Sequence, residues 1–162
     1  FRDEDLLEQI PVDPSPFRRG AISCTGTEFC NLALIETKNR MVGWVKELEE
    51  AVDIDSPLRI HLSGCNASCA QPQIADIGFQ GSKTRKDGEI VEAVNVGIGG
   101  GLGPDPEFID WVVKGVACED AVGFVADIIE EYKADSGEDE TFREYVRRVG
   151  TEEVAERAKA EG

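Results

Sequence analysis

Basic residues are scarce in this sequence of 162 residues, which has 17 Lys and Arg against 33 Asp and Glu and a formal net charge of −16 at pH 7. Nucleic-acid binding depends on clustered Lys and Arg that neutralise phosphates, so this charge argues against a nucleic-acid partner. Such an acidic surface suits a cytoplasm with very high salt, where charges are screened over short distances. We therefore expect a halophilic source; an ordinary acidic protein with an acidic tail is the alternative.

Long apolar segments are also missing. No apolar run reaches about 18 residues, and no basic start is followed by an apolar segment, so the sequence predicts neither a membrane span nor a signal peptide. The hydrophobic content of 41% is typical of a globular protein with a core. We expect a cytoplasmic protein without a membrane partner.

Four of the five cysteines form two short pairs, Cys24-x5-Cys30 and Cys65-x3-Cys69. Disulfides do not persist in a reducing cytosol, so the cysteines indicate metal or redox chemistry. Thiolates bind soft iron or zinc, and these spacings let the sulfurs converge if the chain bends between them. Zinc sites usually have shorter gaps such as C-x2-C, but spacing alone leaves structural zinc and an iron–sulfur centre equally open. Cys118 has no partner in sequence and is interpreted as a small buried residue.

The apolar periodicity predicts a mixed α/β (α+β) fold. The expected helices are 27–52 and 120–132, with a further amphipathic segment at 142–149; the expected strands are 58–62, 73–79 and 90–98, the last two joined by a polar turn over 83–89. The first helix would begin near Cys30, where free N–H groups stabilise a thiolate. Its first turns would bury four apolar residues beside a metal centre, namely Phe29, Leu32, Leu34 and Ile35. We expect the polar end, 151–162, to be a marginal helix or partly frayed.

The residues around the cysteines carry more information than the spacing. The segments SCTGTEFCNLALIETKNR (23–40) and LRIHLSGCNASCAQPQIADIGFQG (58–81), followed by GGGLG (99–103) and VACED (116–120), resemble in the same order the ferredoxin-dependent nitrite and sulfite reductases. The resemblance covers about residues 20 to 133. It implies the fold of the nitrite/sulfite reductase 4Fe-4S domain, with a hairpin and helix of a ferredoxin-like half-domain.

The resemblance also implies the cofactors. Cys24, Cys30, Cys65 and Cys69 would bind a [4Fe-4S] cluster, and Cys69 would bridge that cluster to sirohaem. The implied activity is the assimilatory six-electron reduction of nitrite to ammonium with reduced ferredoxin. The gap between the pairs, the IGFQG segment and VACED are closer to nitrite reductases, with sulfite reductase as the alternative and a non-catalytic zinc-binding domain as a weaker one. One departure is that the family's G-C-P-N-x-C is here Gly64-Cys65-Asn66-Ala67-Ser68-Cys69.

The chain starts at Phe1 without a methionine, and the family has a comparable N-terminal half, so we expect a C-terminal portion of an enzyme. Its expected parts are an extended connector over 1–20, suggested by three prolines, a cluster- and sirohaem-binding domain over 21–133, and an acidic helical tail over 134–162. The substrate-binding and proton-donating residues are expected in the missing half, so no catalytic residue is assigned in this chain.

The remaining candidates have ordinary structural alternatives. Arg59 could contact a sirohaem carboxylate or pair with an acid. His61, the only histidine, is interpreted as structural more readily than as a proton donor. The basic group Lys83, Arg85 and Lys86 could face a cofactor carboxylate or ferredoxin, but a solvated hairpin turn is favoured.

Overall fold

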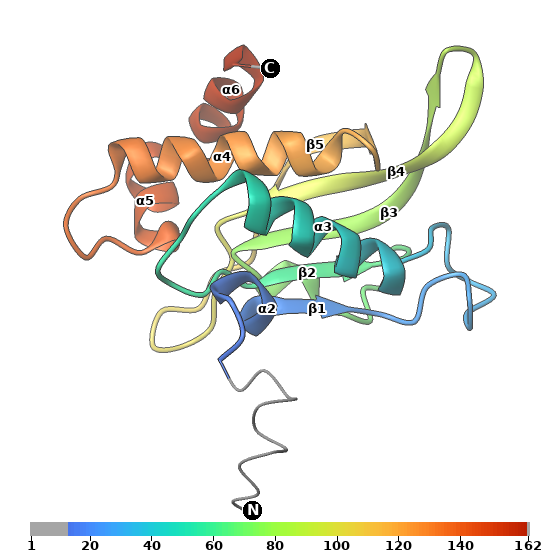
Figure 1. The fold of residues 1–162 in the computed structure, drawn as a ribbon, viewed down its shortest axis with the longest axis horizontal. Helices are drawn as coiled ribbons and strands as arrows, with labels where there is room; N and C mark the ends of the chain where they lie inside the picture. Colours follow the sequence, from blue (N-terminus) through green and yellow to red (C-terminus); the bar gives the residue numbers. More distant parts are fainter. Residues whose placement is uncertain (1–12, 162) are drawn as a thin grey trace, which may run out of the picture.

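The computed structural model describes residues 13–161, which form a five-stranded mixed sheet with two helices along one face (Figure 1). The strands are β1 (Ala21–Ser23), β2 (Ile60–Ser63), β3 (Ile77–Lys86), β4 (Glu89–Ile98) and β5 (Asp110–Ala117). The helices are α2 (Pro16–Gly20), α3 (Lys38–Ala51), α4 (Ala121–Asp135), α5 (Phe142–Val149) and α6 (Thr151–Glu161), with the 3-10 turn η1 (Pro72–Ile74) before β3. The mixed α/β class predicted from the sequence is confirmed.

The sheet combines parallel and antiparallel pairing in the order β1-β2-β3-β4-β5. β2 runs parallel to both β1 and β3, whereas β4 and β5 continue the sheet antiparallel. The predicted hairpin is confirmed, but its turn is shorter than the expected 83–89: only Asp87 and Gly88, with positive φ values of 52° and 88°, join β3 to β4. Positive φ at both turn residues matches the right-handed twist of the strands. Residues 73–76, expected to begin the strand, instead include η1 and the approach to β3.

The core lies between the sheet and the helices α3 and α4, which run along the same face of the sheet in Figure 1. In α3 the spacing of three and four residues buries Met41, Trp44 and Leu48. The ring of Trp44 packs on Phe79 of β3 with 5.0 Å between the ring centroids. In α4 the buried residues are Ala121, Val122, Val125, Ile128 and Ile129. The apolar spacing of each helix therefore marks the face that packs on the sheet.

The predicted start of the first helix was wrong. α3 begins at Lys38 because the Glu36 carboxylate accepts hydrogen bonds from the N–H groups of Asn39 and Arg40 (3.0 and 2.9 Å), which fixes the helix N-terminus there. Residues 27–37 form turns. Phe29, Leu32 and Leu34 are consequently 71%, 74% and 43% exposed, since the apolar side chains of these turns do not share one helix face. Only Ile35 of the four is buried, at 0% exposure. Cys30 lies in a turn, so the argument from helix N–H groups does not apply to it.

The expected extended connector also differs from the structure. Residues 1–12 lie outside the described part, but α2 follows at Pro16–Gly20. Proline excludes the interior of a helix, yet Pro16 stands at its beginning, where no N–H is needed. The Ser15 hydroxyl caps this turn by accepting from the N–H of Arg18 (3.2 Å).

The C-terminal segment is a packed helix rather than a frayed one. α6 places Val154, Ala155 and Ala158 at 0%, 2% and 1% exposure, and it packs against α4 and α5. These small side chains let the helices approach closely, although they give the segment little hydrophobic character in sequence. Among the described helices, none has the length and apolar character needed to cross a membrane.

Glu140 makes the loop between α4 and α5 sensitive to acid. Its carboxylate accepts hydrogen bonds from Arg148 Nε and from the N–H of Gly137 (both 2.8 Å), and these bonds lower the pKa of Glu140 from 4.5 to about 2. A lowered pKa means that the stabilisation is complete above pH 4.5 and is lost as the pH falls toward 2. Glu140→Gln should thus destabilise the chain at neutral pH, by an amount that shrinks as the pH falls through this range.

Urea unfolding of the 162-residue chain at a series of pH values measures this difference. Glu152→Gln, on an exposed residue of α6, is the control and should follow the unsubstituted chain. A difference between Glu140→Gln and the unsubstituted chain that stays constant from pH 7 to pH 2 would contradict the prediction.

Candidate metal centre

Two cysteine-bearing loops leave the same edge of the sheet. Cys24 directly follows β1, and Cys65 comes two residues after the end of β2. Because β1 and β2 are parallel neighbours, their carboxyl ends meet at one edge, where open α/β sheets commonly bind ligands. The loop after β1 extends from this end of the sheet in Figure 1. Cys24, Cys30, Cys65 and Cys69 all line one cavity of about 370 Å³ between the loops.

The four cysteines differ in exposure. Cys24, Cys30 and Cys65 are partly buried, Cys69 is exposed, and all four are free thiols. Within residues 13–161 no three His, Cys, Asp or Glu side chains converge at single-ion distances. The four thiols surround a cavity and do not converge on the position of a single metal ion. Four thiolates around such a cavity are the donor set of a [4Fe-4S] cluster.

Tight turns bring Cys30 back toward Cys24. The N–H of Cys30 donates to the carbonyl oxygen of Gly26 (3.0 Å), and the N–H of Ala33 donates to that of Cys30 (3.2 Å). Gly26 itself has a positive φ of 64°, which a residue without a Cβ adopts easily. The N–H of Leu34 then donates to the carbonyl oxygen of Gly64 (2.8 Å) and ties the first loop to the second.

The second loop holds its shape without the family's proline. The N–H of Ser68 donates to the carbonyl oxygen of Cys65 (3.3 Å), and Ser68 has a φ of 58°. The Ser68 hydroxyl accepts from Gln73 Nε2 (2.7 Å), while the Ser63 hydroxyl accepts from the N–H of Ala70 (3.0 Å). Side-chain hydrogen bonds thus define the turn that a fixed φ would otherwise define.

The sulfur of Cys24 has polar neighbours that the sequence did not identify. The N–H of Gly64 donates to Cys24 Sγ (3.1 Å). The hydroxyl of Thr37, in the IETK segment, donates to the carbonyl oxygen of Cys24 (2.7 Å). Thr37 was not predicted as a site residue, because an interior Thr in a polar segment carries no signal of its own.

The other sequence candidates have structural partners. Cys118 is 4% exposed and does not line the cavity, and burial raises the pKa of its thiol to about 11, so it stays protonated. Lys86 pairs with Glu119 and Asp120 (2.6 and 2.8 Å), which raises the pKa of Lys86. Lys83 lies 3.7 Å from Glu92. Both lysines therefore lie in partly exposed ion pairs, where the sequence favoured a solvated turn, and the partners of Lys86 lie just before α4 rather than in the hairpin.

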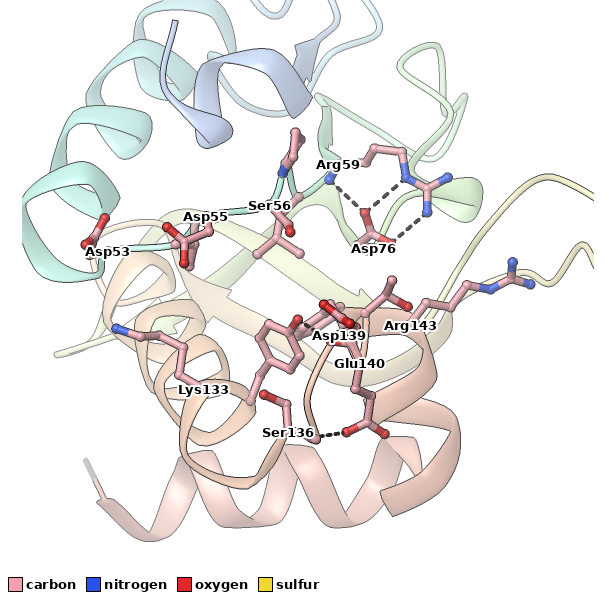
Figure 2. Close-up of a pocket in the computed structure, with 17 residues that line it drawn as sticks. Asp53, Asp55, Ser56, Arg59, Asp76, Lys133, Ser136, Asp139, Glu140 and Arg143 are labelled. Atoms are coloured by element: carbon pink, nitrogen blue, oxygen red, sulfur yellow. Dashed lines mark hydrogen bonds and ion pairs between the residues drawn. The ribbon is translucent and has the colours of Figure 1, made fainter.

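Arg59 pairs with an acid that the sequence did not identify. Asp76, 6% exposed, accepts hydrogen bonds from the backbone N–H, Nε and Nη2 of Arg59 (2.8, 3.0 and 2.6 Å), and these raise the pKa of Arg59. Figure 2 shows this pair in a second cavity of about 670 Å³ at the amino ends of β2 and β3, away from the cysteines. His61 is 5% exposed, with Nδ1 3.1 Å from the carbonyl oxygen of Gln71, and so has the structural position expected.

A comparison with known protein families shows the family of this chain. The nitrite and sulphite reductase 4Fe-4S domain matches residues 15–161, so the chain belongs to this family. The match extends beyond the resemblance in the sequence and includes the C-terminal helices α5 and α6.

Individual relatives agree with this assignment. The chain is 44% identical over 156 residues to the assimilatory ferredoxin-dependent nitrite reductase of Haloferax mediterranei, covering 94% of this chain and 27% of the relative. It is 49% identical over 117 residues to the ferredoxin–nitrite reductase of Synechococcus elongatus, covering 72% of this chain and 23% of that relative. The solved structure of the Mycobacterium tuberculosis NirA protein matches with a TM-score of 0.84 and 31% identity over 93% of this chain and 29% of that one. The chain thus spans about a quarter of the length of these proteins.

Proposed function

We propose that this chain is the cluster-binding part of a ferredoxin-dependent nitrite reductase that reduces nitrite to ammonium in an assimilatory reaction. The observation that carries the proposal is the single cavity lined by Cys24, Cys30, Cys65 and Cys69, in a chain whose relatives are named as such reductases. The rest of the enzyme, which in the relatives makes up about three quarters of the length, would complete the cofactor site and supply the substrate-binding and proton-donating residues. We place the enzyme in the cytoplasm of a halophilic organism, because its net charge is −16.

The four cysteines would hold a [4Fe-4S] cluster, each through its sulfur. Cys69 is the exposed member of the set, and this is the position expected of a thiolate that also contacts the iron of sirohaem. When bound, the cluster and sirohaem supply the electron transfer from ferredoxin to the substrate anion. The chain contributes the placement of the sulfurs at one sheet edge, and the hydrogen bonds of Gly64 and Ser68 fix the second loop.

Sulfite reduction is the second candidate, because the family description names both nitrite and sulphite reductases. Steady-state turnover of the complete enzyme with reduced ferredoxin separates the two anions. The proposal predicts a kcat/KM for nitrite at least about tenfold above that for sulfite, a difference of roughly 1.4 kcal/mol in transition-state stabilisation. A preference for sulfite would replace the proposal with the alternative.

A further inference from the structure

Thr37 lies between the two cysteine loops and is not one of the proposed cluster ligands. Its side chain is completely buried, and its hydroxyl donates to the carbonyl oxygen of Cys24 (2.7 Å) and lies 3.8 Å from Cys24 Sγ. Thr37 stands at the N-cap of α3, yet its hydroxyl makes no capping hydrogen bond, because Glu36 supplies those contacts. The hydroxyl therefore contacts Cys24 and does not cap the helix.

Two glycines make room for this side chain. A Cβ atom at Gly26 would lie 2.6 Å from Thr37 Oγ1, so the first loop can approach the hydroxyl only with glycine at this position. A Cβ atom at Gly64 would lie 3.3 Å from Thr37 Cγ2. Thr37 thus presents its hydroxyl to the first cysteine loop and its methyl group to the second, and it fills the space between them.

The geometry at Cys24 depends on both loops. Gly64, which packs beside the Thr37 methyl group, donates its N–H to Cys24 Sγ (3.1 Å). Hydrogen bonds to a ligand sulfur stabilise the extra negative charge of a reduced iron–sulfur cluster and so raise its reduction potential. Holding the Cys24 backbone against the Gly64 N–H would keep this bond short.

We propose that Thr37 is a positioning residue that sets the reduction potential of the cluster by holding Cys24 Sγ against the N–H of Gly64. The inference rests on the proposed cluster but does not depend on which anion is reduced. Removal of the hydroxyl releases the Cys24 carbonyl, the Gly64–Cys24 contact lengthens, and the potential becomes more negative.

Redox titration of the complete enzyme, followed by electron paramagnetic resonance of the reduced cluster, tests the proposal. Thr37→Val keeps the shape and removes the hydroxyl, whereas Thr37→Ser keeps the hydroxyl and removes the methyl group. Thr27→Val makes the same chemical change on an exposed side chain of the same loop. The expected result is a more negative potential in Thr37→Val and a potential equal to that of the wild type in Thr37→Ser and Thr27→Val.

An unchanged potential in Thr37→Val, or an equal shift in Thr27→Val, would overturn the proposal. If Thr37→Val does not retain the cluster, Thr37→Ser decides: wild-type cluster content and potential assign the effect to the hydroxyl, and the same loss in the serine variant rejects it. A wild-type enzyme without iron and sulfide would instead contradict the proposed function, which keeps the two failures distinct.

Discussion

Replacing Cys69 by serine in the complete enzyme is expected to lower nitrite turnover more than about 100-fold, beyond the 10- to 100-fold that loss of an outer hydrogen-bond partner costs a metal site. Cys69 is the exposed thiol of the set that lines the cavity and is the proposed bridge to sirohaem, so its removal would separate the cluster from that group. The electron paramagnetic resonance spectrum should lose the signature of a coupled centre. Stopped-flow reduction by ferredoxin and steady-state turnover give the two rates.

The matched control for this prediction is Cys118→Ala. Cys118 is buried, and its thiol stays protonated because burial raises its pKa to about 11. Its replacement by a small apolar residue should leave the spectrum and turnover close to those of the wild type. Retained turnover in Cys69→Ser would show that another cysteine makes the bridge.

Replacing Phe79 by alanine is expected to destabilise the 162-residue chain by about 3–5 kcal/mol, the usual cost of removing a buried aromatic ring. Phe79 is 2% exposed and packs on Trp44, where β3 meets α3. Since a domain has only about 5–15 kcal/mol of stability, this loss should remove much of the folded population. Denaturant unfolding followed by tryptophan fluorescence, to which Trp44 and Trp111 both contribute, measures the change.

Phe108→Ala provides the comparison, because Phe108 is 72% exposed in this chain. It should change the free energy of unfolding by no more than about 0.5 kcal/mol. Equal losses in the two variants would mean that α3 does not pack on the sheet as described.

The elements with a clear period could be predicted from the sequence. The apolar spacing in α3 and α4 and the Asp87-Gly88 turn depend on local chemistry, so the end of α3, both bounds of α4 and the position of the turn were identified nearly correctly. β5 (Asp110–Ala117) was missed because the side chains along it alternate little in burial, and Gly115 interrupts it. α6 was underestimated because a helix that packs through alanine needs few large apolar residues.

The positions that failed are those where contacts distant in sequence decide the structure. The apolar residues within 29–35 are compatible with a helix. The hydrogen bond from the N–H of Leu34 to the carbonyl oxygen of Gly64 and the positive φ of Gly26 impose turns instead. Asp76 was missed for a related reason, since its partner Arg59 is distant in sequence and directly precedes the neighbouring strand β2. The cysteine set was predicted from its flanking segments, whereas the contribution of Thr37 required its packing between two loops.

Chemical analysis of the metal centre tests the central claim most directly. Iron, zinc and acid-labile sulfide should be determined in the purified complete enzyme, with the visible spectrum recorded on the same sample. Four thiolates around a shared cavity predict about four iron and four sulfide per chain for the cluster, and the proposed sirohaem would add one further iron. A colourless protein that contains zinc and no sulfide would contradict the account.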